Sequence, residues 1–137
     1  MKNVLVLILL ALFTTTGFAQ KVKFKKDMVL IDDIEAYKMK ESGSTQVYST
    51  LSGKEFMVIS AMSYREEDDI AINITKQYVY IVRFLKSGKV VYTDASQKKM
   101  VANVYNDQMV DADGNVDEKK LEEFIFKYNN ASLKNKL

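Results

Sequence analysis

Apolar and polar residues alternate along the first part of the chain, which is the pattern of strands with one exposed face. Residues 21–25 show it most clearly, because Val22 and Phe24 fall on one face and lysines fall on the other. Further short segments that are rich in apolar residues predict strands at residues 28–31, 34–39, 56–62 and 78–82. The last two segments are apolar on both faces, which indicates strands in the middle of a sheet or covered on both sides.

Two Ser-Gly-Lys tripeptides, at residues 52–54 and 87–89, separate apolar runs. Glycine supplies the positive φ that many tight turns require, so each tripeptide is a turn signal with a physical mechanism. The two β-hairpins that they predict join residues 47–51 to 56–62 and residues 78–85 to 90–92. Asp32-Asp33 is a weaker turn signal, and it leaves the register of the strands around it open.

Between these hairpins the chain combines a charged run with a long apolar one. Residues 65–69 read Arg-Glu-Glu-Asp-Asp, which predicts an exposed loop, and residues 70–75 then alternate strictly. A single strand from residue 70 to residue 85 would be about 54 Å long, well beyond the usual length of a strand. We therefore expect a break near Lys76-Gln77, or one long bent strand with a bulge.

After Thr93 the apolar positions take a helical spacing. The first apolar stripe consists of residues 100, 101, 104, 105 and 109, and the second of residues 121, 124, 125 and 128. They predict helices at about 95–108 and 117–129. Residues 94–97 resemble a capping box for the first helix, and the Asp117 carboxylate is expected to cap the second.

Strands that all precede the helices indicate an α+β fold. We expect an antiparallel β-sheet of about six to seven strands, a meander of hairpins, followed by two C-terminal α-helices packed on one face. A length of 137 residues suits one domain, which we place at residues 20–137.

The first 19 residues have the three parts of a secretory signal peptide. Lys2 supplies a positive charge, residues 4–13 are apolar throughout, and Gly17 and Ala19 precede a cleavage site before Gln20. The apolar run is too short to cross about 30 Å of hydrocarbon. We therefore expect a signal peptide at residues 1–19, a periplasmic or secreted protein, and no membrane span after signal removal. An uncleaved membrane anchor is the alternative.

Composition excludes most familiar active sites. The sequence contains no His and no Cys, which excludes Ser-His-Asp and Cys-His nucleophiles and the ordinary zinc, haem and iron–sulfur ligand sets. The glycines after residue 19 are too far apart for a phosphate-binding loop. The formal net charge is +2, and basic residues cluster only at residues 21–26, where they protect an edge strand from aggregation. We expect no cofactor, no metal and no nucleic acid partner.

The segment from Asp111 to Asp117 is similar to a calcium-binding loop. Together with Glu122 it offers oxygens at positions 1, 3, 5 and 12 of such a loop. However, a calcium loop needs glycine at position 6, where this chain has Val116, and Gly114 stands at position 4. We interpret the segment as a turn followed by a helix cap, without metal.

The acidic residues 66–69 are the main remaining source of hydrolytic chemistry, because a pair of carboxylates is enough to hydrolyse glycosides. Neighbours in sequence are poorly placed to flank a sugar, and nothing marks a distant acid as a partner. We interpret these residues as a solvated loop.

Arg83 interrupts an otherwise apolar strand. If the turn at Ser87-Gly88 has two residues, Arg83 lies opposite Tyr92, and its guanidinium either stacks on that ring or receives an anion. A three-residue turn would shift the register and remove the pair.

The chain has eight tyrosines, more than a plain core requires. Tyr78 and Tyr80 share one face of their strand, and together with Arg83 and Tyr92 they are the candidate binding residues for a protein, peptide or glycan. Half-buried packing on the sheet is the alternative interpretation of the tyrosines.

Four segments carry a resemblance to a group of bacterial proteins. They are the end of the signal peptide, Phe-Ala-Gln at 18–20, and the segments Lys-Val-Lys-Phe-Lys-Lys at 21–26, Gly-Lys-Glu-Phe at 53–56 and Asp-Gly-Asn-Val-Asp at 113–117 leading into Leu-Glu-Glu-Phe at 121–124. In them the chain resembles small uncharacterised exported proteins of Bacteroidota-type bacteria. The resemblance implies export and no particular activity, so it assigns no functional residue.

From the missing catalytic side chains we infer an exported, non-catalytic binding or accessory module. Two alternatives stay open. A carboxylate-dependent glycan hydrolase needs two acids about 5 to 9.5 Å apart in a cleft, and a carrier of an apolar ligand needs strands that curl around a cavity.

Overall fold

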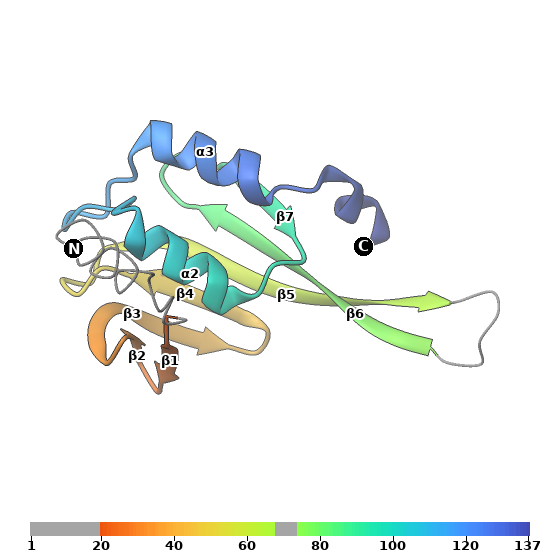
Figure 1. The fold of residues 1–137 in the computed structure, drawn as a ribbon, viewed down its shortest axis with the longest axis horizontal. Coiled ribbons are helices and arrows are strands. Elements are labelled where there is room, and N and C mark those ends of the chain that lie inside the picture. The colour runs from red at the N-terminus through yellow and green to blue at the C-terminus, as the bar shows by residue number, and fades with distance from the viewer. Residues whose placement is uncertain (1–19, 68–73) are drawn as a thin grey trace, which may run out of the picture.

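The computed structural model describes residues 20–67 and 74–137, which form one antiparallel sheet followed by helices (Figure 1). Within these residues the sheet has seven strands, each paired with the next along the chain. They are β1 (Val22–Lys25), β2 (Met28–Ile31), β3 (Ile34–Ser42), β4 (Thr45–Ser49), β5 (Glu55–Glu67), β6 (Ile74–Phe84) and β7 (Val90–Thr93). The helices are α2 (Gln97–Asn106), α3 (Glu118–Tyr128) and the short 3₁₀ helix η1 (Ala131–Lys136). The predicted α+β fold and the antiparallel meander are confirmed.

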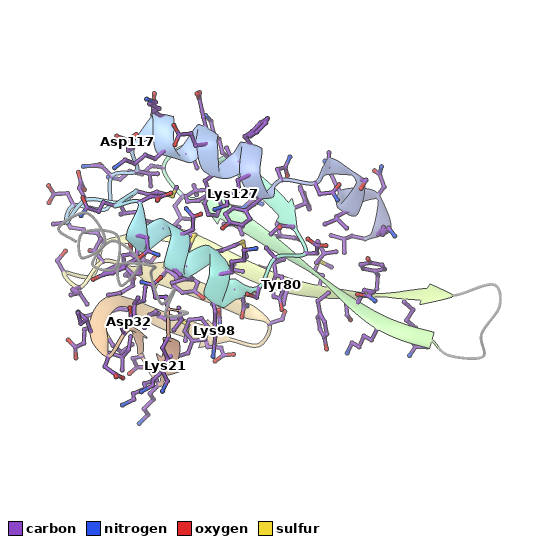
Figure 2. All side chains as sticks on the ribbon, viewed as in Figure 1. Lys21, Asp32, Tyr80, Lys98, Asp117 and Lys127 are labelled. Atoms are coloured by element: carbon purple, nitrogen blue, oxygen red, sulfur yellow. The ribbon has the colours of Figure 1, made fainter. Side chains whose placement is uncertain are left out.

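Helix α3 begins at the residue that the sequence predicts. The Asp117 carboxylate accepts the backbone N–H of Lys120 at 3.0 Å and so satisfies one of the free amides of the first turn (Figure 2). The buried residues of α3 are those of the predicted stripe, Leu121, Phe124 and Tyr128. No helix that the structure describes is long and apolar enough to cross a membrane.

Helix α2 begins later than its predicted capping box. Ser96 is the N-cap, and its hydroxyl accepts the backbone N–H of Lys99 at 3.2 Å. The capping box at residues 94–97 is therefore wrong. The helix begins later because the Thr93 hydroxyl accepts the N–H of Ala95 at 3.1 Å and keeps the chain in a turn before the helix.

Side chains of the sheet and of both α-helices form one connected core. The rings of Phe84 on β6 and Phe124 on α3 meet edge to face, with centroids 5.5 Å apart and an angle of 85° between the planes. Tyr48 is also fully buried, and its hydroxyl donates to Gln46 Oε1 at 2.5 Å. Burial raises the pKa of Tyr48 above its ordinary value, so this hydroxyl stays neutral and remains a donor.

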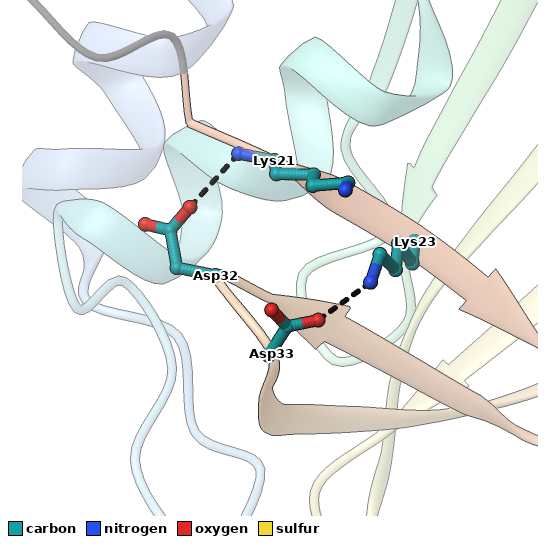
Figure 3. A network of polar contacts seen from close by, with 4 residues as sticks. All are labelled: Lys21, Lys23, Asp32 and Asp33. Atoms are coloured by element: carbon teal, nitrogen blue, oxygen red, sulfur yellow. Dashed lines mark hydrogen bonds and ion pairs between the residues drawn. The ribbon is translucent and has the colours of Figure 1, made fainter.

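A tight turn with two aspartates fixes the register at the start of the sheet (Figure 3). Asp32 and Asp33 join β2 to β3 with φ angles of 51° and 65°, which match the right-handed twist of a hairpin. The Asp32 carboxylate accepts the backbone N–H of Lys21 at 2.9 Å, and Asp33 forms an ion pair with Lys23 at 2.6 Å. The hydrogen bond from Lys23, and next its charge, lower the pKa of the Asp33 carboxyl.

Two β-bulges turn consecutive residues toward the core. The register between β2 and β3 skips Ala36, and both Ala36 and Tyr37 are buried. The register between β4 and β5 skips Phe56, and both Phe56 and Met57 are buried. The rings of Tyr37 and Phe56 then lie with centroids 5.0 Å apart. A bulge thus accounts for the neighbouring apolar residues at the start of β5.

Strands β5 and β6 form a hairpin that is longer than predicted. β5 runs through Arg65 to Glu67, where the charges predicted a loop, and β6 runs without interruption through Lys76 and Gln77. The pairs from Met57 opposite Phe84 to Glu67 opposite Ile74 show no shift of register. The predicted loop at 65–67 and the predicted break near Lys76-Gln77 are therefore wrong, and the described part of β6 contains no bulge opposite β5. Residues 68–73, which include the rest of the acidic run and most of the alternating segment, lie outside the described residues.

Candidate functional site

Among the described strands, none lies beside the far end of the β5–β6 hairpin on either side. We call this part the β5–β6 arm, and it comprises residues 62–67 of β5 and 74–79 of β6. β4 follows β5 only as far as Ala61, whose N–H donates to the Ser44 carbonyl at 2.9 Å. β7 follows β6 only as far as Tyr80. The arm extends away from the two α-helices (Figure 1), and it is two strands wide.

The outer edge of β5 carries backbone groups that have no partner strand. Successive residues of an antiparallel strand turn their N–H and C=O groups alternately to its two sides. The Ala61 N–H points toward β4, so Ser63 and Arg65 present their N–H and C=O groups on that same outer side. Within the described residues, no hydrogen bond reaches these outward groups of Ser63 and Arg65.

The outer edge of β6 has the same property. The Phe84 N–H points toward β7 and donates to the Lys89 carbonyl at 3.0 Å. By the same alternation, Tyr78 and Lys76 turn their backbone groups to that side, beyond the end of β7. In the part of the chain that the structure describes, these groups also lack a hydrogen-bond partner.

By contrast, the outer edge of β7 is covered at Tyr92. The Tyr92 N–H donates to Asn129 Oδ1 at 3.0 Å, and the Asn130 N–H donates to the Tyr92 carbonyl at 2.7 Å. The Nζ of Lys134, on η1, lies 5.9 Å from the centre of the half-buried Tyr92 ring. The chain that follows α3 thus forms hydrogen bonds with the backbone of Tyr92 and places a lysine near its ring.

The predicted pairing of Arg83 with Tyr92 is wrong. Arg83 pairs with Val90, and Tyr92 pairs with Ile81. The cause is the turn, because residues 85–89 form a five-residue connection in which the Gly88 N–H donates to the Phe84 carbonyl at 2.9 Å. The Arg83 side chain is exposed on the face of the sheet opposite Val82 and Phe84.

Tyr78 and Tyr80 share one face of β6, as their spacing predicts. They pair with Ser63 and Ala61, so each tyrosine has a small residue opposite it. Tyr78 is 48% exposed, and the Nζ of Lys76 lies 5.3 Å from the centre of its ring. Tyr80 is half-buried and packs against the core. Among the four candidate binding residues, Tyr78 is the aromatic residue most open to solvent.

The opposite face of the arm adds a residue that sequence reasoning missed. Met62 is 44% exposed, and the next side chain on its face, Tyr64, is half-buried with Lys136 Nζ 5.0 Å from its ring centre. Val79, which pairs with Met62, is fully buried. The apolar run at 56–62 placed Met62 in the core, whereas it lies one residue beyond the last contact with β4.

These features give the arm two open edges and exposed apolar side chains on both faces. The chain matches no family model, no curated protein and no solved structure. The geometry and charge of its own residues are therefore the basis for a functional assignment.

The calcium-like segment is held together by its own hydrogen bonds. Asp111 Oδ1 accepts the backbone N–H groups of Asp113 and Asn115, both at 2.9 Å, and the Asn115 amide donates to Asp111 Oδ2 at 3.1 Å. The bonds from Asn115 lower the pKa of the Asp111 carboxyl. No group of three or more acidic residues among the described residues is arranged to hold a metal ion. Asp111 is thus the centre of the turn that leads to the Asp117 cap.

Proposed function

We propose that the chain is an exported, non-catalytic protein that binds an extended segment of another protein along the edge of the β5–β6 arm. The observation that carries the proposal is the row of outward backbone groups at Ser63 and Arg65, which have no hydrogen-bond partner among the described residues. An extended peptide that adds to such an edge gains main-chain hydrogen bonds, and its side chains then meet those of the neighbouring strand. Met62 and Tyr78 supply exposed contact surface next to the edges.

The chemistry of the edge favours a polypeptide over a glycan. Outward N–H and C=O groups recur at every second residue, which is the spacing at which another strand presents its own groups. A glycan has no matching series of donors and acceptors. Tyr78 then serves a side-chain contact with the added segment, because aromatic residues are enriched in protein interfaces.

A comparison with the β1 and β7 edges supports a function for the open edge of β5. Open edges invite aggregation, and proteins protect them with lysines or with covering chain. Here Lys21, Lys23 and Lys25 line the β1 edge, and residues 129–130 cover the β7 edge at Tyr92. The outward backbone groups of Ser63 have neither kind of protection from the described residues.

Export remains part of the proposal and is supported by the pattern of residues 1–19, which lie outside the described residues. A binding module in the periplasm or outside the cell fits a chain whose sequence lacks Cys and His. The carrier alternative needs a sheet that curls around a cavity, whereas the described sheet is open, with β1 and β7 at opposite ends of the strand order. The hydrolase alternative relies on residues 66–69, of which the first two belong to β5.

Replacing Ser63 by proline tests the proposal. A benzoylphenylalanine probe at Arg65, compared with the same probe at the exposed Lys40, first identifies the partner in the producing cells by photo-crosslinking. Binding of the crosslinked partner segment is then measured by calorimetry. Ser63→Pro removes an outward N–H and leaves the ladder with β6 intact, so we expect binding to weaken about tenfold, while Ser63→Ala binds like wild type.

A melting temperature of Ser63→Pro close to that of wild type confirms that the arm is still folded. The proposal is contradicted if Arg65 gives no adduct beyond that at Lys40. It is also contradicted if Ser63→Pro, folded, binds the crosslinked segment as tightly as Ser63→Ala does.

A further inference from the structure

A second feature lies far from the arm, where the start of β1 meets the two α-helices. Here the surface forms an open cavity of about 450 Å³. Lys98 and Lys99 of α2 and Lys127 of α3 line it, and Figure 2 marks Lys98 and Lys127 on their helices. Its volume falls within the range of small-molecule sites.

The lysines of this cavity have no carboxylate partner among the described residues. The ion pair found among those residues joins Lys23 to Asp33 and lies outside the cavity. Of the residues that the structure describes, no acidic one lines the cavity. A concave surface that carries charge of one sign concentrates the field and attracts counter-ions.

The polar groups between the lysines are fixed in place. Asn103 Oδ1 accepts both Lys127 Nζ at 2.8 Å and the Tyr128 hydroxyl at 2.9 Å, which holds the Lys127 ammonium at the cavity. The Asn103 amide donates to Asp107 Oδ2 at 2.8 Å, which fixes the orientation of the amide. Lys98 Nζ lies 5.9 Å from the centre of the Phe24 ring. Lys127 is thus held by a neutral amide oxygen, and Lys98 lies near an apolar ring.

The side of the cavity toward β1 is closed by a pair of amides. Gln20 Nε2 donates to Asn106 Oδ1 at 2.8 Å, and Asn106 Nδ2 donates to Gln20 Oε1 at 2.6 Å. Each amide satisfies the other, so the start of the described chain is attached to α2. The cavity is therefore built from three separate segments of the sequence, which lie together only in the folded protein.

We propose that this cavity binds a small anion that carries phosphate groups. The lining carries three lysines and no acidic residue among the described residues, so an anion with more than one charge matches its charge. Lysine is a common phosphate ligand because it acts as a point charge, whereas planar carboxylates are matched best by the fork of arginine, which is missing from this lining. Inorganic pyrophosphate is the simplest probe with this chemistry.

Titration calorimetry with pyrophosphate at constant ionic strength tests the proposal. We expect saturable binding at millimolar concentration or below, and about tenfold weaker binding in each of Lys99→Gln and Lys127→Gln. Lys40→Gln removes an exposed lysine that does not line the cavity and should bind like wild type.

Thermal melts without pyrophosphate show whether each variant folds. If Lys127→Gln does not fold, Lys99→Gln is the decisive variant, because the Lys99 side chain is exposed. Absence of saturable binding to the wild type would overturn the proposal. Equal weakening by Lys40→Gln and Lys99→Gln would also overturn it, because binding would then reflect net charge alone. Neither result bears on the arm.

Discussion

Phe124→Ala should cost about 3 to 5 kcal/mol of unfolding free energy, which is a large part of the stability of an ordinary small protein. Phe124 is 1% exposed, and its ring lies between Phe84 on β6, with centroids 5.5 Å apart, and Tyr128 on α3, with centroids 4.7 Å apart. Its removal leaves a cavity where α3 meets the sheet. The loss includes the transfer free energy of the ring and the contacts of both neighbours.

Phe126→Ala is the matched control for this prediction. Phe126 lies two residues further along the same helix and is 93% exposed, so its truncation should change stability by less than about 0.5 kcal/mol. Urea melts of both variants give the comparison. A similar loss in the two variants would mean that α3 does not bury the predicted face.

Gly114→Ala should cost about 2 to 3 kcal/mol. Gly114 is buried with a φ of 78°, which an L-residue adopts only with strain. A Cβ at this position would lie 3.0 Å from Lys54 Cβ and 3.6 Å from the Lys54 carbonyl oxygen. The substitution therefore forces the loop before α3 away from the β4–β5 turn. The same contact explains why this glycine stands at position 4 of the calcium-like segment and not at position 6.

Gly43→Ala separates the two causes. Gly43 has a φ of 61°, and a Cβ there meets no heavy atom within 4 Å, so it carries the strain of positive φ without the contact. We expect about 1 kcal/mol for this variant, because part of the strain is offset by a less flexible unfolded chain. Chemical denaturation midpoints distinguish the two. Equal losses at both positions would contradict the close packing of Gly114 on Lys54.

Local signals were enough to predict much of the fold. The Ser-Gly-Lys turns at 52–54 and 87–89 lie between paired strands, and the stripe from Leu121 to Tyr128 faces the core. These signals act over a few residues, so they can be recognised without knowledge of the rest of the chain. The two bulges were not predicted, because a skipped residue is defined by its partner strand and not by its own sequence.

The arm shows where local signals fail. Charges at 65–67 predicted a loop, but a two-stranded arm that is only partly covered, by η1 near Tyr64, accepts charged residues in strand conformation. The open edges depend on where β4 and β7 end. The lengths of these two strands cannot be inferred from the residues of β5 and β6. The shared face of Tyr78 and Tyr80 was predictable, since it follows from the period of a strand. The partner of Arg83 was not, because it depends on the length of the turn that follows.

Amide hydrogen exchange at single residues is the most direct test of the open edge and of its use. Tyr64 and Gln77 turn their N–H groups toward each other across the arm, whereas Ser63 and Arg65 turn theirs outward. In the free protein we expect slow exchange at Tyr64 and Gln77 and fast exchange at Ser63 and Arg65. On addition of the crosslinked partner segment, Ser63 and Arg65 should become protected by at least about tenfold while the inward pair changes little. Protection of Ser63 and Arg65 already in the free protein, or exchange at these amides that the bound segment leaves unchanged, would contradict binding along this edge.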